Sequence, residues 1–281
     1  MPSLKPLEPG AMFWAGRDSV AGIRALGVRC GQLGVGNGVE LSGAAAARWK
    51  AELARERFTL VTVFAAFEGE SYADIPTVRR TVGFIPRETR EERERRTMEV
   101  SDFTAGLGVR SIACHIGFIP ENRSNADRIA VRDMVRRVCE HAAGHRQTFA
   151  LETGQETAQG LLHFIEDVSR PNLRINFDPA NMILYGTGEP IPALRTLAPL
   201  VASVHCKDGD WPPERPRGAL GVERRLGEGS VGIARFVRTL AEIGFRGPLN
   251  VEREAEDPEE RLRDIRKAVQ LLRLVARGVG G

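Results

Sequence analysis

Short apolar runs alternate with longer helical patterns along nearly the whole chain, and this alternation limits the folds that the chain can adopt. A strand followed by a helix, repeated many times, predicts a parallel sheet with helices packed outside it. Eight segments have the length and apolar composition of such strands: 12–15, 28–33, 59–64, 111–116, 148–152, 174–178, 201–206 and 249–252. Eight parallel strands can close into a barrel, which leaves no unpaired strand edge.

The segments between these strands have helical periodicity: 44–56, 90–107, 126–143, 158–168 and 233–243, with 259–275 closing the chain. Glycines stand where helices should end, as expected for the residue after a last helical turn: Gly27, Gly108, Gly144 and Gly244. The chain has 281 residues and 42% hydrophobic content, and barrels of about 250 residues commonly form one domain. The sequence therefore predicts a single α/β domain, residues 1–281, with the (β/α)8 TIM-barrel fold.

A doubly wound open sheet is the main alternative to the barrel. Such a sheet would usually carry a Gly-rich phosphate loop that opens a helix directly after the first strand. The glycines between Gly34 and Gly38 follow the second predicted strand, but the next helical pattern begins only at Ala44. A dinucleotide site is therefore not expected, and the closed barrel is favoured.

The charged residues are numerous but balanced. The chain has 40 Lys and Arg against 37 Asp and Glu, which gives a formal net charge of +3. The most charged stretch, residues 87–96, alternates signs at spacings that favour pairs one helical turn apart, so we expect a solvated helix face. Because binding to a nucleic-acid backbone depends on clustered Lys and Arg, no nucleic-acid partner is expected.

The cysteines and the apolar runs indicate a soluble, cytoplasmic protein. The cysteines lack the paired spacing of a zinc or redox site, and we expect buried thiols in a reducing compartment: Cys30, Cys114, Cys139 and Cys206. No apolar run approaches the roughly 20 residues that span a bilayer, and the N-terminal stretch MPSLKPLEPG lacks the apolar core of a signal peptide. No membrane contact is expected.

Four of the later strands each end in a side chain that can bind a metal ion: Glu152, Asp178, His205 and Glu252. Alternate residues of a strand share a face, so these four point into the barrel while their apolar neighbours point toward the helices. All four would gather at the C-terminal rim, where barrel active sites lie. A lone carboxylate there is more often a helix cap or a surface acid, but three together would repel one another without a cation. One imidazole with three carboxylates suits one divalent ion, Mn²⁺ first, with Mg²⁺, Co²⁺ or Zn²⁺ as alternatives.

Such a centre supports a specific chemistry on sugars. A metal bound to a substrate carbonyl and its neighbouring hydroxyl makes the adjacent C–H acidic and stabilises the resulting enediolate. With Glu152 and Glu252 on opposite sides of that plane, one can remove the proton and the other can return it from the far face, which epimerises the carbon. An aldose–ketose shift needs only one of the two glutamates.

At these residues the sequence resembles the xylose-isomerase-like superfamily of sugar phosphate isomerases and epimerases. The similar stretches cover strands five to eight: ALETGQE, NFDPANMILYGTGEP, SVHCKDGD and LGEGSVGIARFVRTLAEIGFRGPLNVERE. The resemblance implies that Glu152, Asp178, His205 and Glu252 bind one divalent metal, usually Mn²⁺, and that the two glutamates act as acid and base. It also implies a small-molecule carbohydrate substrate and a homodimer or homotetramer. The ketose 3-epimerase branch has a histidine three residues after the strand-six aspartate, whereas this chain has Asn181.

Five further residues are predicted to bind substrate: His115, Glu156, Asn181, Lys207 and Trp14. Each has a simpler interpretation as well. His115 could be a satisfied rim histidine, Lys207 could pair with the next residue, and Trp14 could be a core aromatic. Glu156 and Asn181 could serve helix starts. The remaining histidines are predicted to lie on the surface, on or beside helices: His141, His145 and His163.

The sequence thus predicts a divalent-metal-dependent isomerase or epimerase acting on a keto-sugar or sugar derivative. The second hypothesis is a lyase or dehydratase on a keto-sugar, keto-glycoside or inosose, because the same enediolate can expel a β-substituent. A DNA-repair role is disfavoured. Apurinic endonucleases, the DNA-repair branch of the superfamily, use a histidine-rich cluster of three zinc ions, whereas only His115 and His205 are placed at the mouth of this barrel. A non-catalytic sugar-binding barrel is disfavoured because both glutamates are present.

Overall fold

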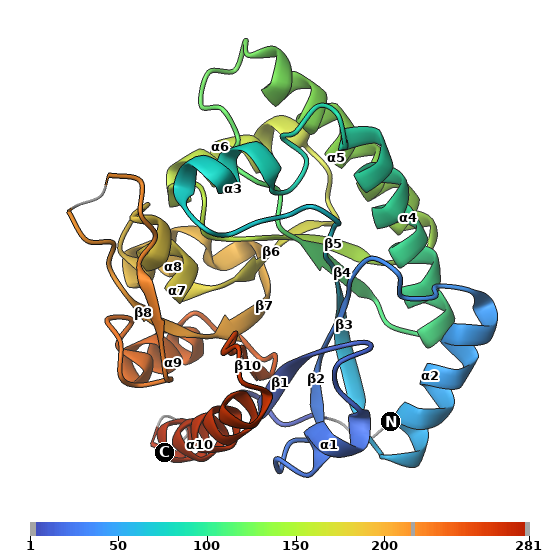
Figure 1. The fold of residues 1–281 in the computed structure, drawn as a ribbon, viewed down its shortest axis with the longest axis vertical. Helices are drawn as coiled ribbons and strands as arrows, with labels where there is room; N and C mark the ends of the chain where they lie inside the picture. The colour runs from blue at the N-terminus through green and yellow to red at the C-terminus, as the bar shows by residue number, and fades with distance from the viewer. Residues whose placement is uncertain (1–3, 215–216, 279–281) are drawn as a thin grey trace.

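The computed structural model describes residues 4–214 and 217–278, and its core is a closed barrel of parallel strands (Figure 1). Around the barrel the strands follow the order β1-β10-β7-β6-β5-β4-β3-β2. Their bounds are Pro9–Trp14 (β1), Cys30–Val35 (β2), Thr59–Ala65 (β3), Ser111–Cys114 (β4), Thr148–Glu152 (β5), Leu173–Phe177 (β6), Val201–Cys206 (β7) and Leu249–Val251 (β10). The predicted (β/α)8 fold class is confirmed. The first and last three residues of the predicted domain lie outside the described residues.

Helices surround the barrel (Figure 1). They are α1 (Val20–Arg24), α2 (Gly43–Arg55), α3 (Ile75–Thr81), α4 (Arg90–Leu107), α5 (Ala126–Gly144), α6 (Ala158–Val168), α7 (Pro179–Tyr185), α8 (Pro190–Leu197), α9 (Ile233–Glu242) and α10 (Pro258–Arg277). The six longer helices were predicted within two residues at each end. The four short ones were not, because one or two turns give too few residues for a periodic pattern.

The main apolar core lies between the barrel and the helices. Phe149 and Leu151 of β5 and Phe177 of β6 are fully buried there, as the alternation within these strands predicted. Burial of each such side chain contributes about 1.5–3 kcal/mol, so this layer is a major stabilising part of the fold. A second, smaller apolar cluster fills the barrel lumen: Met12, Phe64, Ala113 and Ala150, with Trp14 packed against them.

The helix ends follow the glycine prediction with one exception. Gly27, Gly108 and Gly244 adopt positive φ values of 93°, 77° and 78° after their helices, a conformation that glycine adopts at little cost. Gly144 is instead the last residue of α5, and the left-handed residue is Arg146, with φ 58°. The prediction for Gly144 was wrong because α5 continues one residue further than its apolar pattern.

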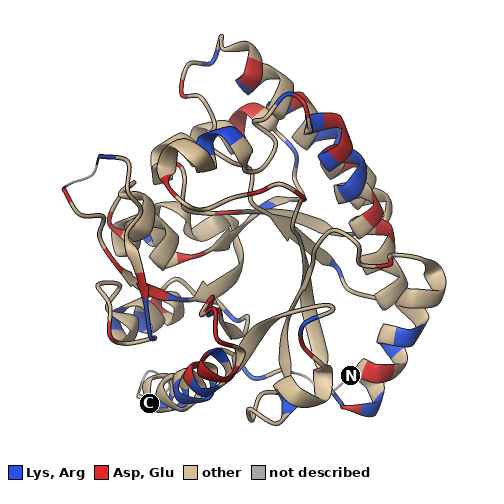
Figure 2. Ribbon diagram, viewed as in Figure 1, with Lys and Arg blue, Asp and Glu red and all other residues tan. Residues whose placement is uncertain are grey.

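The charged stretch 87–96 is only partly the solvated face that the sequence predicted. Figure 2 shows acidic and basic residues mixed along α4 and α10, while the barrel strands are largely uncharged. Arg93, however, is 3% exposed and donates hydrogen bonds to the carbonyls of Thr81, Gly83 and Glu68. Its planar fork of donors pairs with carbonyls at the end of α3 and in two loops, so charge alternation alone did not reveal its burial.

The long connection after β7 carries its own small sheet. Strands β8 (Asp208–Asp210) and β9 (Val222–Arg224) pair antiparallel, with residues 215 and 216 of the intervening loop outside the described part. Asp208 accepts hydrogen bonds from the backbone N–H groups of Gly209, Gly227 and Val231, so it holds this loop in place. Within the described ranges, none of the helices has the length and apolar character needed to cross a membrane.

Candidate metal centre

The four predicted ligands converge at one point of the barrel mouth. Glu152 ends β5 and His205 lies in β7, while Asp178 and Glu252 directly follow β6 and β10. One ligand atom from each lies within 4.8 Å of the others. Asp178 and His205 are fully buried, Glu152 is 1% exposed and Glu252 is 9% exposed. The barrel thus brings together side chains that are far apart in the sequence.

His205 is held in one orientation by hydrogen bonds inside the lumen. Its Nε2 lies 2.8 Å from Oε1 of Gln32, and Nε2 of Gln32 donates to Oδ1 of Asn176 at 3.1 Å. The amide of Gln32 therefore presents its oxygen to the imidazole, which assigns the ring hydrogen to Nε2. Nδ1 is then the atom with a free lone pair, and it faces the carboxylates.

Three carboxylates surround this nitrogen. Nδ1 of His205 lies 2.6 Å from Oε1 of Glu152, 3.2 Å from Oε2 of Glu252 and 3.6 Å from Oδ2 of Asp178. Burial alone would lower the pKa of His205, but Glu252 and Glu152 raise it well above its ordinary value. The cluster therefore demands a positive charge at its centre, either a proton on the imidazole or a metal cation.

Asp178 divides its two oxygens between structure and the centre. Oδ1 accepts the backbone N–H of Asn181 at 2.9 Å and so caps α7, the simpler role considered for a strand-end carboxylate. Oδ2 is buried and forms no hydrogen bond with the described residues. Burial raises the pKa of Asp178. A buried carboxylate oxygen without a hydrogen-bond partner, 3.6 Å from Nδ1 of His205, fits a divalent cation between the two atoms. The oxygen-rich set with one imidazole suits Mn²⁺ or Mg²⁺ and admits Co²⁺ or Zn²⁺.

Each glutamate also has its own basic partner. Oε2 of Glu152 lies 2.8 Å from Nε2 of His115, and Oε2 of Glu252 lies 3.2 Å from Nζ of Lys207. Burial opposes ionisation of Glu152, but His115 and His205 lower its pKa to about 2. Burial likewise lowers the pKa of His115, but the carboxylate of Glu152 more than offsets it and raises this pKa to about 9. Both glutamates are thus held as carboxylates with a proton donor beside them.

The other predicted substrate-binding residues lie at different distances from this centre. Lys207 is 3% exposed and also pairs with Glu254 at 2.9 Å, rather than with Asp208. Asn181 is buried in the first turn of α7, close to the loop after β5. Trp14 is half-buried beside the lumen cluster, where only a glycine at position 34 leaves room for its ring.

Glu156 lines a cavity of about 950 Å³ that does not include the four predicted ligands among its lining residues. Gln155 also lines this cavity, and its Nε2 lies 3.4 Å from Nδ1 of His115, which connects the cavity to Glu152. Oε1 of Glu156 accepts the N–H of Ile119 at 2.8 Å, whereas its buried Oε2 is without a partner in the described ranges. Burial raises the pKa of Glu156 to about 8, so at neutral pH it is largely a protonated acid that can donate a hydrogen bond.

Sequence reasoning missed the residues that support the centre. Gln32, Asn176 and Ser203 form a buried polar network below His205, in which Oγ of Ser203 donates to Asn176 at 2.5 Å. A signal was present, because each is a polar residue at an inward position of an otherwise apolar strand. Gln155, which contacts His115, lies in a loop and has no comparable signal.

Comparison with known families identifies the class of protein. The family model described as xylose isomerase-like TIM barrel matches residues 20–275, and the chain belongs to this family. A comparison with curated proteins gave no match.

Solved structures show the same architecture. The xylose isomerase domain protein from Planctomyces limnophilus is 42% identical, with 98% of this chain and 99% of that chain covered and a TM-score of 0.94. A xylose isomerase-like TIM barrel protein from Mycobacterium smegmatis, in complex with magnesium, is 17% identical over 98% of each chain, with a TM-score of 0.69. D-allulose 3-epimerase from Methylomonas sp. is 18% identical over 98% of this chain and 100% of that one, with a TM-score of 0.70. The last two likenesses concern the fold alone.

Proposed function

We propose that the protein is a divalent-metal-dependent sugar isomerase or epimerase that acts on a keto-sugar or sugar derivative. The observation that carries this proposal is the pair of buried glutamates, Glu152 and Glu252, whose oxygens lie 2.6 and 3.2 Å from Nδ1 of His205. Family membership supports it, as does the presence of a ketose epimerase among proteins of the same fold.

Glu152, Asp178, His205 and Glu252 would hold one cation, for which we propose Mn²⁺. Magnesium is the ion bound by a protein of similar fold, and Co²⁺ and Zn²⁺ also suit the ligands. When bound, such an ion polarises a carbonyl group and makes the neighbouring C–H bond more acidic. It would also supply the positive charge that the three carboxylates require.

The chain's own residues would then move the proton. One glutamate takes the proton from the carbon beside the carbonyl, and the other returns a proton to the opposite face. His115 contacts the Glu152 oxygen that does not face His205, whereas Lys207 contacts the Glu252 oxygen that also faces His205. Each can share a proton with its partner and keep that carboxylate in place. Because the two glutamates have different partners, one imidazole and one amine, we expect them to differ in basicity.

We propose that His115, Glu156, Asn181, Lys207 and Trp14 bind the substrate. The protonated carboxyl of Glu156 would donate to a sugar oxygen at the cavity wall, and the ring of Trp14 would pack against the sugar. The four free and buried cysteines support a cytoplasmic location, which we also propose.

Exchange with solvent deuterium tests the proposed chemistry. The protein, reloaded with Mn²⁺, is incubated in D₂O with a panel of keto-sugars, and deuterium on the carbon beside the carbonyl is followed by NMR. We expect incorporation together with an epimer or an aldose for at least one sugar, and loss of both in Glu152→Gln. Glu91→Gln, the same change on the exposed face of α4, should react as the wild type does.

The products separate this proposal from its nearest alternative. Loss of a hydroxyl or alkoxide from the substrate, with no epimer formed, would show a lyase or dehydratase instead. An absence of both exchange and elimination with every sugar, in a protein that holds the metal, would refute sugar isomerisation.

A further inference from the structure

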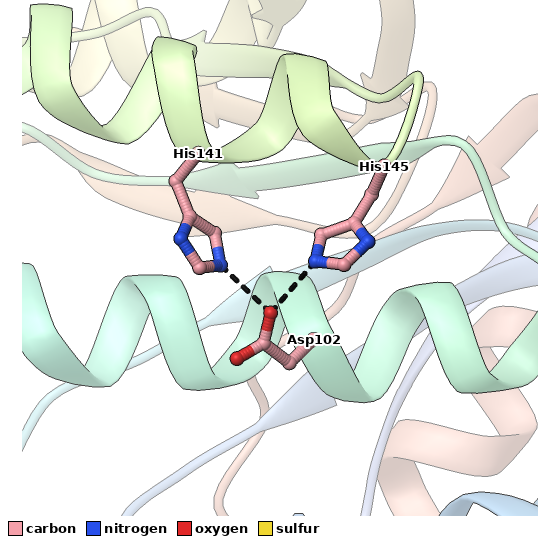
Figure 3. Close-up of side chains that lie close together, drawn as sticks. All are labelled: Asp102, His141 and His145. Carbon is pink, nitrogen blue, oxygen red and sulfur yellow. Dashed lines mark hydrogen bonds and ion pairs between the residues drawn. The ribbon is translucent and has the colours of Figure 1, made fainter.

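A second group of potential metal ligands lies on the outside of the barrel, where helices α4 and α5 pack together. Figure 3 shows His141 on one helix and His145 at the end of that helix, with both rings aimed at Asp102 on the other helix. Nε2 of His141 lies 2.7 Å, and Nε2 of His145 2.8 Å, from the same oxygen, Oδ1 of Asp102. The three ligand atoms lie within 4.8 Å of one another.

We propose that Asp102, His141 and His145 bind a borderline transition-metal cation, of the class of Zn²⁺, Ni²⁺, Co²⁺ and Cu²⁺. The proposal does not depend on the barrel function. Two imidazole nitrogens and one carboxylate are the ligand types that these ions prefer, whereas Mg²⁺ and Ca²⁺ prefer oxygen ligands. The barrel centre has the opposite composition, with three carboxylates and one imidazole.

The helical framework presents the two imidazoles together. Residues four apart lie on the same face of a helix, one turn from each other, and His145 is the C-cap residue of α5. Their ring centroids are 5.4 Å apart. The carbonyl groups at the C-terminal end of α5 also carry a partial negative charge, which favours a cation at this position.

Neighbouring contacts hold α4 against α5 on both sides of the cluster. Ser101, next to Asp102, donates to Oε1 of the buried Gln147 at 2.6 Å, and Nε2 of Gln147 donates back to the carbonyl of Ser101 at 3.0 Å. One or two turns away, Arg137 forms two hydrogen bonds with Glu94, at 2.5 and 2.7 Å. The ligands are therefore positioned before an ion binds, which reduces the ordering needed on binding.

Metal binding requires only a small movement of the side chains. Zinc lies about 2.0–2.1 Å from imidazole nitrogen and 2.0–2.2 Å from carboxylate oxygen, so tetrahedral ligand atoms are about 3.3 Å apart. The two N···O distances here would lengthen by roughly half an ångström as the ion replaces the bridging hydrogens. The side chain of Asp102 is 57% exposed, and those of His141 and His145 are 31% and 36% exposed, so water can complete the coordination. This openness predicts a reversible site rather than a permanently filled one.

Copper(II) binding to the untagged protein tests the proposal, because the EPR spectrum reports how many nitrogens bind the ion. The barrel cluster contains one imidazole and the surface cluster two, so the number of bound nitrogens distinguishes the two sites. Cu²⁺ is added in steps to the wild type, His141→Ala, His145→Ala and Asp102→Asn. His163→Ala removes an exposed histidine of α6 that bonds only to Gln159 among the described residues, so it is the matched control. Thermal melts verify that every variant is folded.

We expect the wild type and His163→Ala to show a two-nitrogen signal. Both should bind one Cu²⁺ at least tenfold more tightly than His141→Ala or His145→Ala. A Zn²⁺ titration followed by calorimetry should give the same ranking, with Asp102→Asn between the wild type and the histidine variants. Equal affinity and identical spectra in the wild type, His141→Ala and His145→Ala would overturn the proposal and leave the three residues as a hydrogen-bonded contact between helices.

Discussion

The protein carries two clusters of metal-ligand residues whose environments are opposite. In the barrel, three carboxylates surround one buried imidazole, and Oδ2 of Asp178 has no hydrogen-bond partner among the described residues. On the surface, two imidazoles share one exposed carboxylate, and hydrogen bonds already join all three. The buried cluster places three carboxylates where water cannot solvate them, so they require a positive charge at their centre, whereas the exposed cluster is satisfied as it stands. A cation should therefore matter far more for the barrel centre.

The largest expected effect comes from removing one charge at the barrel centre. Glu252→Gln keeps the shape of the side chain but removes a ligand charge and a base, so we expect turnover to fall at least about 10³-fold. Steady-state kinetics on the substrate found by deuterium exchange measures this effect. His141→Ala, at the exposed cluster, should change turnover less than twofold. Similar losses in both variants would contradict the contrast between the clusters.

Metal removal should destabilise the fold mainly through the barrel centre. An ion present at about 100 times its dissociation constant stabilises the folded state by about 2.7 kcal/mol, which corresponds to a rise in Tm of roughly 5 °C for a chain of this size. Calorimetry with EDTA and then with Mn²⁺ measures the shift. The shift should persist in His141→Ala and disappear in Glu152→Gln. Persistence in Glu152→Gln would place the stabilising ion elsewhere.

The hydrogen bond that orients His205 can be tested separately from metal binding by His205 itself, by comparing two Gln–His pairs. Gln32 fixes the buried His205 at 2.8 Å, and Gln159 bonds the exposed His163 at 2.9 Å. Loss of such a support commonly lowers metal affinity 10–100-fold, so we expect Gln32→Ala to weaken Mn²⁺ binding by about that factor. Gln159→Ala should have no effect. Equal Mn²⁺ affinities in the wild type and Gln32→Ala would show that the hydrogen bond does not orient the ligand.

Glu156 is a carboxyl that belongs to neither cluster, and its titration can be compared with that of an exposed carboxyl. Its folded pKa of about 8 lies above the ordinary value, so the wild type loses stability as pH rises from about 4.5 to 8. Glu156→Gln should match the wild type at pH 4.5 and exceed it by up to about 4 kcal/mol at pH 7.5. Urea unfolding at both pH values measures the difference. Glu121→Gln, in the same cavity but exposed, should keep the wild-type profile, and a Glu156→Gln profile parallel to the wild type would contradict this assignment.

The smallest expected effect belongs to the exposed cluster without metal. Exposed ion pairs contribute about 0.2–1 kcal/mol, so Asp102→Asn should lower the free energy of unfolding by less than 1 kcal/mol in EDTA. Urea unfolding measures this change. Addition of Zn²⁺ should stabilise the wild type more than Asp102→Asn. A larger loss in EDTA would mean that the trio already stabilises the contact between α4 and α5 without an ion.

The parts of the structure that depend on local pattern were predictable from the sequence. The barrel strands and long helices follow from apolar alternation and periodicity, and four ligand-type residues near strand ends could be placed at one rim because parallel strands share their C-terminal ends. Long-range features were not predictable. The roles of Gln32 and Asn176 depend on neighbours across the barrel, and the burial of Arg93 depends on loop carbonyls from distant segments. The convergence of Asp102 with His141 likewise requires knowing how α4 packs on α5.

Elemental analysis of bound metal tests the central claim most directly. Three proteins would be prepared, and all would carry His141→Ala to remove the surface cluster. One keeps the wild-type barrel centre, and the other two carry Glu152→Gln or His205→Ala. Each would be loaded with excess Mn²⁺ before desalting. We predict about one ion per chain with the intact centre and a small fraction of that in the two ligand variants. An intact centre that holds no ion after loading, or ligand variants that retain it fully, would contradict the assignment of Glu152, Asp178, His205 and Glu252 as the metal site.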